Sequence, residues 1–156
     1  MESAVSGALS GLDWKVNLQS VQELLREAKH YGLKIAIENV PEPFPFLLRR
    51  VEDFRRFYED LGEDGLEMGL TFDVGRAYIN GQLDDMMYFF REKIVHIHLY
   101  DNNGDADPHL GIGLGKIDWP SLIRGLRNIG YKRALVIESK NNVEESIEAL
   151  KRLIEK

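Results

Sequence analysis

Four short apolar runs alternate with stretches of helical spacing along this chain, and that alternation restricts the fold more than any other feature. The runs are LKIAI, MGLTF, IVHIHL and ALVI, at residues 33–37, 68–72, 94–99 and 134–137. Apolar strands that alternate with helices pair in parallel and are covered on both faces. The sequence therefore predicts an α/β fold whose core is a parallel (βα)₄ sheet, preceded by one helix.

The helices are recognised by apolar residues at intervals of three and four and by the residues that cap them. They are expected over residues 17–31, 51–61 and 83–91, after Asp118, and from Asn142 onwards. Residues 1–16 are rich in glycine and serine, which indicates a loop. A chain of 156 residues can bury a substantial core, and no linker divides it, so we expect one domain over residues 1–156.

The composition argues against several classes of function. The chain has no cysteine, so it can form neither a disulfide framework nor a thiolate metal site. Its net charge of −6 makes a nucleic-acid backbone an unfavourable main partner, because phosphate binding depends on Lys and Arg. It has no apolar run of membrane-spanning length and no signal-peptide pattern. We therefore expect a cytoplasmic protein without a membrane partner.

Each predicted strand ends at or beside a polar residue: Glu38, Asp73, His98 and Glu138, separated by 35, 25 and 40 residues. Each residue alone could simply cap its strand. In parallel α/β sheets, however, the carboxyl ends of all strands share one rim, where ligands bind. Three carboxylates and an imidazole at one rim would repel each other without a cation. The set predicts a divalent metal site; its oxygens favour Mn²⁺ or Mg²⁺, and its histidine also suits Zn²⁺ or Co²⁺.

His96 lies on the same strand as His98 and is predicted to face away from it.

The segments IAIENVP, LTFDVGRAY, HIHLYDNNGDADPHLGIGLGKIDW and LVIESK resemble the xylose isomerase-like TIM-barrel superfamily. This superfamily contains sugar and sugar-phosphate isomerases and epimerases, together with endonuclease IV of AP endonuclease family 2. The resemblance runs from about Asn17 to the end of the chain and corresponds to strands five to eight of the barrel. It implies the C-terminal half of a TIM barrel, in which residues 1–16 are what remains of the loop after a missing fourth strand.

For the isomerase and epimerase branch, the resemblance implies that Glu38, Asp73, His98 and Glu138 bind the metal. It also implies that Glu38 and Glu138 form an acid/base pair. The metal would polarise a substrate carbonyl, one glutamate would remove the proton beside it, and the other would return a proton. The implied substrate is a sugar or a sugar phosphate.

Arg76, Asp107 and His109 are further candidates, for contact with the substrate. Asp107 and His109 match the D-x-H pair that supplies further metals in the endonuclease branch; the alternative is an Asx turn before Pro108 with a packed histidine. Arg76 stands where both branches usually have histidine. A guanidinium does not ligate a metal as imidazole does, but it can bind an anionic substrate or pair with a nearby carboxylate. This departure weakens the endonuclease interpretation most.

The first half of the barrel has no counterpart in this sequence, so three functions stay open. The first is a metal-dependent isomerase or epimerase, active if a partner supplies the other half. The second is a DNA-repair phosphodiesterase related to endonuclease IV, and the third is a non-enzymatic metal-binding protein. A lone four-stranded sheet would also leave two apolar edges unpaired, and such edges pair with another chain unless they are blocked. We therefore expect a homodimer, the commonest closed symmetry.

Overall fold

The computed structural model describes residues 2–40 and 47–155. The chain forms two compact units. Unit 1 contains the residues up to Ile35 together with Glu52–Met68, and unit 2 contains Ala36–Val51 and the residues from Gly69 onwards. None of the helices in the described ranges is long and apolar enough to cross a bilayer.

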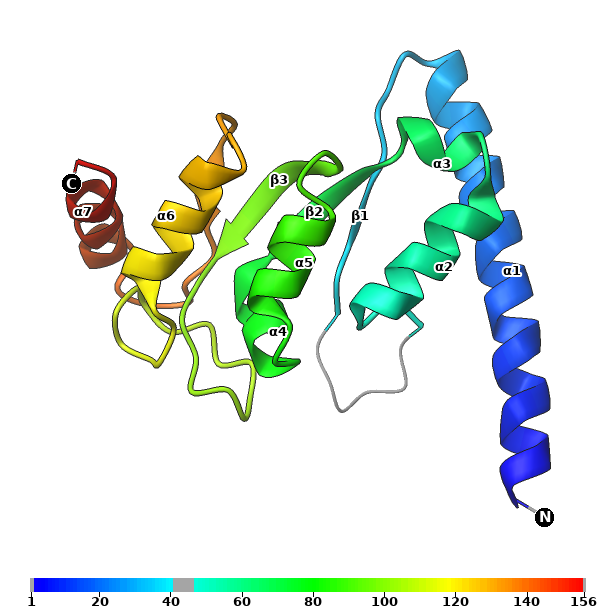
Figure 1. Ribbon diagram of the computed structural model, residues 1–156, viewed down its shortest axis with the longest axis horizontal. Coiled ribbons are helices and arrows are strands. Elements are labelled where there is room, and N and C mark those ends of the chain that lie inside the picture. The colour runs from blue at the N-terminus through cyan, green and yellow to red at the C-terminus, as the bar shows by residue number, and fades with distance from the viewer. Residues whose placement is uncertain (1, 41–46, 156) are drawn as a thin grey trace. The chain divides into compact units, whose positions relative to one another are not determined.

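Unit 1 consists of α1 (Glu2–His30), nearly all of α2 (Val51–Leu61), and α3 (Asp64–Glu67) (Figure 1). The prediction of a loop over residues 1–16 is wrong for the residues that the structure describes, because α1 already begins at residue 2. Each glycine costs a helix only about 1 kcal/mol, serine costs less, and no proline interrupts α1. Asn17 therefore lies inside a helix and not at its start. The short helix α3 was not predicted, because four residues are too few for a periodic pattern.

Trp14 links α1 to α2 within unit 1. Its indole Nε1–H donates a hydrogen bond to Asp60 Oδ2 over 2.8 Å. Its ring meets the ring of Phe57 edge-on, with the centroids 5.6 Å apart. The guanidinium of Arg56 lies 4.5 Å from the centroid of the same indole ring. Tryptophan buries a large apolar area and offers one polar atom, and both properties are used in this contact.

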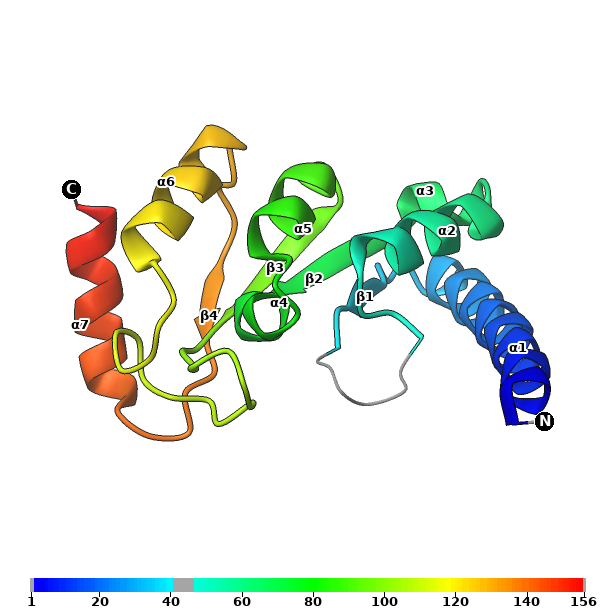
Figure 2. The same ribbon diagram turned by 60° about the horizontal axis from the view of Figure 1, so that its bottom comes forward.

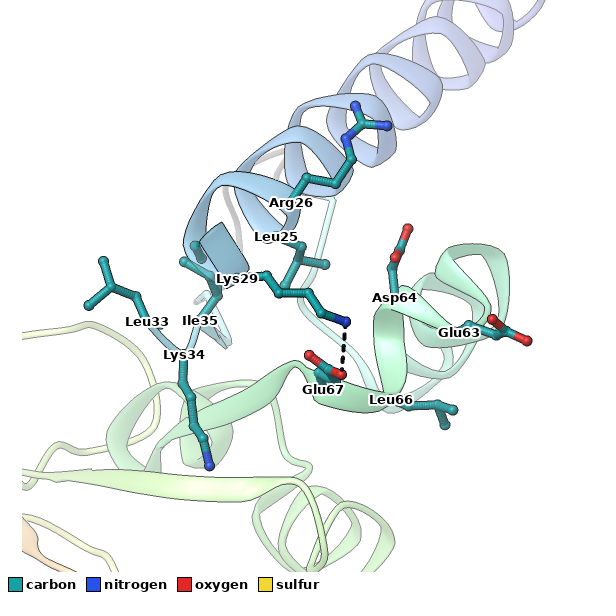
Figure 3. A pocket seen from close by; sticks show the side chains of 11 residues that line it. Leu25, Arg26, Lys29, Leu33, Lys34, Ile35, Glu63, Asp64, Leu66 and Glu67 are labelled. Carbon is teal, nitrogen blue, oxygen red and sulfur yellow. Dashed lines mark hydrogen bonds and ion pairs between the residues drawn. The ribbon is translucent and has the colours of Figure 1, made fainter. Parts of the chain in front are cut away.

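A hollow of about 690 Å³ lies between the end of α1 and the region of α3 (Figure 3). Its lining mixes aliphatic side chains with charges of both signs. The ion pair drawn across it joins Lys29 Nζ to Glu67 Oε1 at 3.4 Å. Both side chains are mostly exposed, so this pair adds little to stability. The described lining residues include no convergent set of ligand atoms, and the hollow indicates no chemistry.

Unit 2 is built on a four-stranded sheet in the order β1-β2-β3-β4, and all of its strands are parallel. This confirms the predicted α/β fold, with strands that alternate with helices and with a helix before the first strand (Figure 1). Each strand lies within two or three residues of its predicted place. The strands are β1 (Ala36–Glu38), β2 (Gly69–Asp73), β3 (Ile94–Leu99) and β4 (Leu135–Ile137).

In the described part of unit 2, four helices connect and follow these strands, and neighbours along the chain pack against one another: α4 with α5, α5 with α6, and α6 with α7 (Figure 2). The predicted cap of α6 is present, because Asp118 Oδ1 accepts a hydrogen bond from Ser121 N over 3.0 Å and a proline lies in the first turn. The helices are α4 (Val74–Ile79), α5 (Leu83–Phe89), α6 (Trp119–Asn128) and α7 (Val143–Ile154).

The two faces of the sheet differ, since side chains alternate along each strand. The two central strands contribute four fully buried side chains to one face, namely Leu70, Phe72, Ile97 and Leu99. Between them lie half-buried positions such as Thr71, His96 and His98. The prediction that His96 faces away from His98 is wrong, because residues two apart in a strand point the same way. Their rings meet edge-on, with centroids 5.0 Å apart.

Candidate metal centre

Glu38, Asp73, His98 and Glu138 come together at the carboxyl ends of the four strands. Each residue offers one ligand atom, and these atoms all lie within 4.8 Å of one another. Glu38 and Asp73 are the last residues of β1 and β2, His98 is the next-to-last residue of β3, and Glu138 directly follows β4. The sheet aligns Asp73 with His98. The structure therefore brings together the four residues that were expected to converge, which we call the tetrad.

His98 lies between the two glutamates of the tetrad. Its Nδ1 atom is 2.7 Å from Glu38 Oε1 and 3.3 Å from Glu138 Oε1. A ring nitrogen between two carboxylate oxygens carries a hydrogen, because both neighbours are acceptors. A metal that binds through Nδ1 has to displace this hydrogen, so binding would release or relocate a proton.

Asp73 is the most deeply buried member of the tetrad, with no solvent-exposed surface. Its Oδ1 atom accepts a hydrogen bond from Arg76 N over 2.9 Å and so caps α4. Its Oδ2 atom is buried and accepts no hydrogen bond from any described residue. Burial raises the pKa of Asp73 to about 6, against the opposing effect of Arg76 and with a contribution from the charge of Glu38. A buried carboxylate oxygen that accepts no hydrogen bond, beside two more carboxylates and an imidazole, fits a divalent cation.

Asn39 holds the ends of β1 and β2 together, a role that was not predicted from the sequence. The side chain is fully buried. Its Oδ1 atom accepts a hydrogen bond from Asp73 N over 2.8 Å, and its Nδ2 atom donates to Asp73 O over 2.9 Å. The amide thus extends the ladder between the two strands by one step and fixes Glu38 beside Asp73. A polar residue directly after the strand-ending glutamate was the only signal in the sequence.

Arg76 extends its guanidinium toward carboxylates of the tetrad. Its Nη1 atom is 3.1 Å from Glu38 Oε2, and its Nε atom is 3.2 Å from Asp73 Oδ2. Asp107 Oδ2 lies 3.7 Å from the same Nε atom. Burial alone would lower the pKa of Arg76, but the charges of Asp73 and Glu38 raise it above its ordinary value. Of the two roles expected for Arg76, the structure displays the pairing with carboxylates.

Asp107 and His109 border the tetrad on the loop after β3. His109 Nδ1 donates a hydrogen bond to the carbonyl oxygen of Glu138 over 2.9 Å, and its ring stacks on Tyr100 with centroids 3.7 Å apart. Its Nε2 atom is 3.6 Å from Asp107 Oδ1. The backbone of His109 is left-handed, with φ of 53°. His109 therefore joins this loop to the end of β4, outside the tetrad itself.

Gly75 allows Tyr100 to pack beneath the start of α4. A Cβ atom at position 75 would lie 2.2 Å from Cε2 of the Tyr100 ring, which no side chain could accommodate without movement. The Tyr100 side chain is fully buried, and burial together with the charge of Asp73 raises the pKa of its hydroxyl. The hydroxyl thus stays protonated as a neutral neighbour of the tetrad.

Asp101 fixes the long loop after β3, and this role was also not predicted from the sequence. Its carboxylate is fully buried and accepts four hydrogen bonds. Oδ1 accepts from the backbone N–H groups of Asn102 at 2.9 Å and Ile117 at 3.2 Å. Oδ2 accepts from Gly113 N at 2.9 Å and from Trp119 Nε1 at 2.7 Å. One side chain thus satisfies donors spread along the whole loop.

Comparison with known proteins agrees with this architecture. Residues 4–156 match the family described as xylose isomerase-like TIM barrel. The uncharacterized protein MJ1311 of Methanocaldococcus jannaschii is 33% identical over 144 residues, which cover 89% of this chain and 48% of that protein. A D-tagatose 3-epimerase-like protein of known structure is 32% identical, with a TM-score of 0.84, over 91% of this chain and 54% of its own.

A third relative is the TTHB071 protein from Thermus thermophilus, in a structure obtained after soaking with ZnCl₂. It is 25% identical, with a TM-score of 0.65, and the match covers 87% of this chain and 50% of that one. The chain thus spans about half the length of the relatives it matches. The four parallel strands, the tetrad at their carboxyl ends and the match over residues 4–156 lead to one conclusion: the chain belongs to the xylose isomerase-like TIM barrel family.

Proposed function

We propose that this chain acts as a divalent-metal-dependent isomerase or epimerase of sugars or sugar phosphates. The observation that carries the proposal is the tetrad, whose ligand atoms lie within 4.8 Å of one another. The likeness to a D-tagatose 3-epimerase-like protein supports the sugar as substrate class. The relative that was soaked with ZnCl₂ supports a metal-dependent chemistry.

The four tetrad residues would hold the ion. Their oxygen-rich set favours Mn²⁺ or Mg²⁺, and the imidazole of His98 also suits Zn²⁺ or Co²⁺. When bound, the ion supplies a Lewis acid that polarises a substrate carbonyl and makes the neighbouring C–H more acidic. Arg76, Asp107 and His109 lie next to this position, and we assign them contacts with the substrate's hydroxyl or phosphate groups.

Glu138 is better placed than Glu38 to remove the substrate proton. Both oxygens of Glu38 have a partner, His98 at 2.7 Å and Arg76 at 3.1 Å, whereas the ion pair of Glu138 in the described structure is to His98 at 3.3 Å. The charge of Glu138 is therefore less compensated. Glu138 would take the proton from the carbon beside the carbonyl. Glu38, after taking up a proton from solvent, would then deliver it to the opposite face of that carbon, which gives an epimer, or to the adjacent carbon, which gives an isomer.

Proton exchange with solvent tests this function directly. With Mn²⁺ present, we expect the protein to exchange a substrate C–H proton for deuterium in at least one member of a panel of ketoses and their phosphates. Glu138→Gln should slow the exchange by about a hundredfold or more, the usual contribution of a general base. Glu145→Gln, on the exposed side of α7, is the matched control and should leave the rate unchanged. Both rates are read by NMR as loss of the C–H signal.

Assays on the same purified protein also distinguish the two alternative functions, an endonuclease and a metal-binding protein without catalysis. Nicking of an abasic-site DNA duplex without any sugar exchange would reverse the assignment in favour of an endonuclease IV-like phosphodiesterase. Absence of both activities, with Mn²⁺ still bound at one ion per chain, would instead indicate a metal-binding protein without catalysis.

We also propose that the chain forms a homodimer. In the described part of the sheet, β1 is bonded to β2 alone and β4 to β3 alone, which leaves a strand edge open at each side. Open parallel edges favour pairing with another chain, and a second copy offers the same edges. Light scattering coupled to size-exclusion chromatography should give twice the mass of one chain. A well-behaved monomer at micromolar concentration would contradict this proposal.

A further inference from the structure

We propose that Arg76 is an internal counter-cation of the metal centre, which neutralises Glu38 and Asp73 in the metal-free protein and which a divalent ion must displace. The inference rests on the proposed metal site and concerns how that site is held before it is loaded. A residue that pairs with the ligands in this way competes with the metal, and this role is additional to the substrate contact proposed for Arg76.

Each oxygen of the two carboxylates lies beside a nitrogen of Arg76 or His98. Glu38 Oε1 is 2.7 Å from His98 Nδ1, and Glu38 Oε2 is 3.1 Å from Arg76 Nη1. Asp73 Oδ1 accepts the hydrogen bond from Arg76 N that caps α4, and Asp73 Oδ2 is 3.2 Å from Arg76 Nε. An ion that binds Asp73 without uncapping the helix must use Oδ2. That oxygen lies against the guanidinium.

Asp107 gives the displaced guanidinium an alternative partner. Its Oδ2 atom lies 3.7 Å from Arg76 Nε, and its Oδ1 atom is buried and accepts no hydrogen bond from the described residues. Asp107 comes from the loop after β3 and is not a member of the tetrad. A small shift of the Arg76 side chain from Glu38 and Asp73 toward Asp107 would keep the positive charge paired and free two ligand oxygens.

Two measurable consequences follow from this competition. Without Arg76, the metal-free protein keeps three carboxylates close together with less compensating charge, so it should be less stable. The same variant should bind a divalent ion more tightly, because no cation has to be moved and no positive charge remains beside the ion. A purely structural arginine would affect stability without tightening the binding of the metal.

Mn²⁺ titration followed by electron paramagnetic resonance of the free ion tests the proposal without an activity measurement. Arg76→Gln should bind Mn²⁺ at least tenfold more tightly than the wild type, and its melting temperature without metal should be lower. Saturating Mn²⁺ should remove most of that difference. Arg124→Gln is the matched control, since it deletes the same charge from the exposed side of α6, where Arg124 Nη2 donates to Ser121 Oγ. Its Mn²⁺ affinity should stay within twofold of the wild type.

Arg76→Lys serves as a second variant in case Arg76→Gln does not fold. A lysine has one ammonium group and no fork that spans two carboxylates, so we expect tighter Mn²⁺ binding by severalfold. A wild-type affinity for Mn²⁺ equal to or higher than that of the folded variants would overturn the inference and leave the metal site itself intact. Absence of Mn²⁺ binding in the wild type and in both variants would overturn the metal site and the inference together. Mn²⁺ binding by the Arg76→Gln variant alone would support both the metal site and the proposed competition by Arg76.

Discussion

Asp73→Asn is expected to make the metal-free protein more stable near neutral pH and, at the same time, to abolish its binding of divalent ions. Asp73 is fully buried, and burial raises its pKa from 3.8 to about 6. At neutral pH the folded chain must therefore carry a charge that its interior disfavours. Asparagine has the same shape, keeps an oxygen that can accept the hydrogen bond from Arg76 N, and carries no charge.

The sign of the effect follows from proton binding. Between about pH 4 and pH 6 the folded protein holds a proton on Asp73 that the unfolded chain has lost, so the free energy of unfolding falls as the pH rises through this range. Above about pH 6 Asp73 is ionised in both the folded and the unfolded state, and the free energy of unfolding falls no further on its account. A shift of this size corresponds to roughly 3 kcal/mol, which is the most that Asp73→Asn can recover at neutral pH. Below about pH 4 the gain should disappear.

Urea unfolding of the metal-free protein at a series of pH values measures this gain. Asp105→Asn makes the same chemical change at an exposed position of the loop after β3 and should leave the profile unaltered. Mn²⁺ affinity of the wild type should fall as the pH drops through about 6, because the ion and the proton compete for Asp73. An Asp73→Asn protein that is less stable than the wild type at neutral pH would show that Asp73 stabilises the fold as a charge.

The strands and the tetrad could be predicted because they depend on local patterns. Apolar runs such as MGLTF and IVHIHL can be recognised in the sequence as strands. Parallel pairing then brings the carboxyl ends of these strands to one rim of the sheet. His98 and Glu138 are 40 residues apart in the chain, yet that rule alone places them together. The roles of the tetrad as metal ligands, and of Glu38 and Glu138 as acid and base, stay predictions.

The residues that hold the site together could not be predicted, since their partners are set by the fold. Asn39 and Asp101 resemble ordinary loop residues, and only the structure shows that Asn39 bridges to Asp73 and that Asp101 collects donors from a distant part of the same loop. The glycine-rich run GIGLG, at residues 111–115, gave a partial signal, because closely spaced glycines indicate a turn. A Cβ atom at Gly115 would lie 2.3 Å from Asp101 Oδ1, so this glycine permits a close approach within a structural turn.

Asp101→Ala is expected to destabilise the protein by about 4 kcal/mol, at the upper end of what single substitutions do. An ionised carboxylate accepts about four hydrogen bonds, and the four donors around Asp101 fill that capacity. Alanine would leave the N–H group of Ile117 and the indole of Trp119 without acceptors in a buried place, and the N–H group of Gly113 without an acceptor in a partly exposed one. Each unsatisfied buried donor costs about 1 to 3 kcal/mol, although water that enters the gap recovers part of this.

Asp118→Ala provides the matched comparison, because it removes an aspartate from the same connection between β3 and α6. Asp118 is exposed and serves as the cap of α6, so its loss should cost about 1 kcal/mol. Urea unfolding gives both values, and hydrogen exchange distinguishes the mechanisms: Asp101→Ala should speed exchange at Gly113 and Ile117, whereas Asp118→Ala should speed it at Ser121. If the two variants lost equal stability, the loop after β3 would be held by its other backbone contacts, such as the pairing of Asp101 with Leu110, and the four hydrogen bonds to the carboxylate would contribute little.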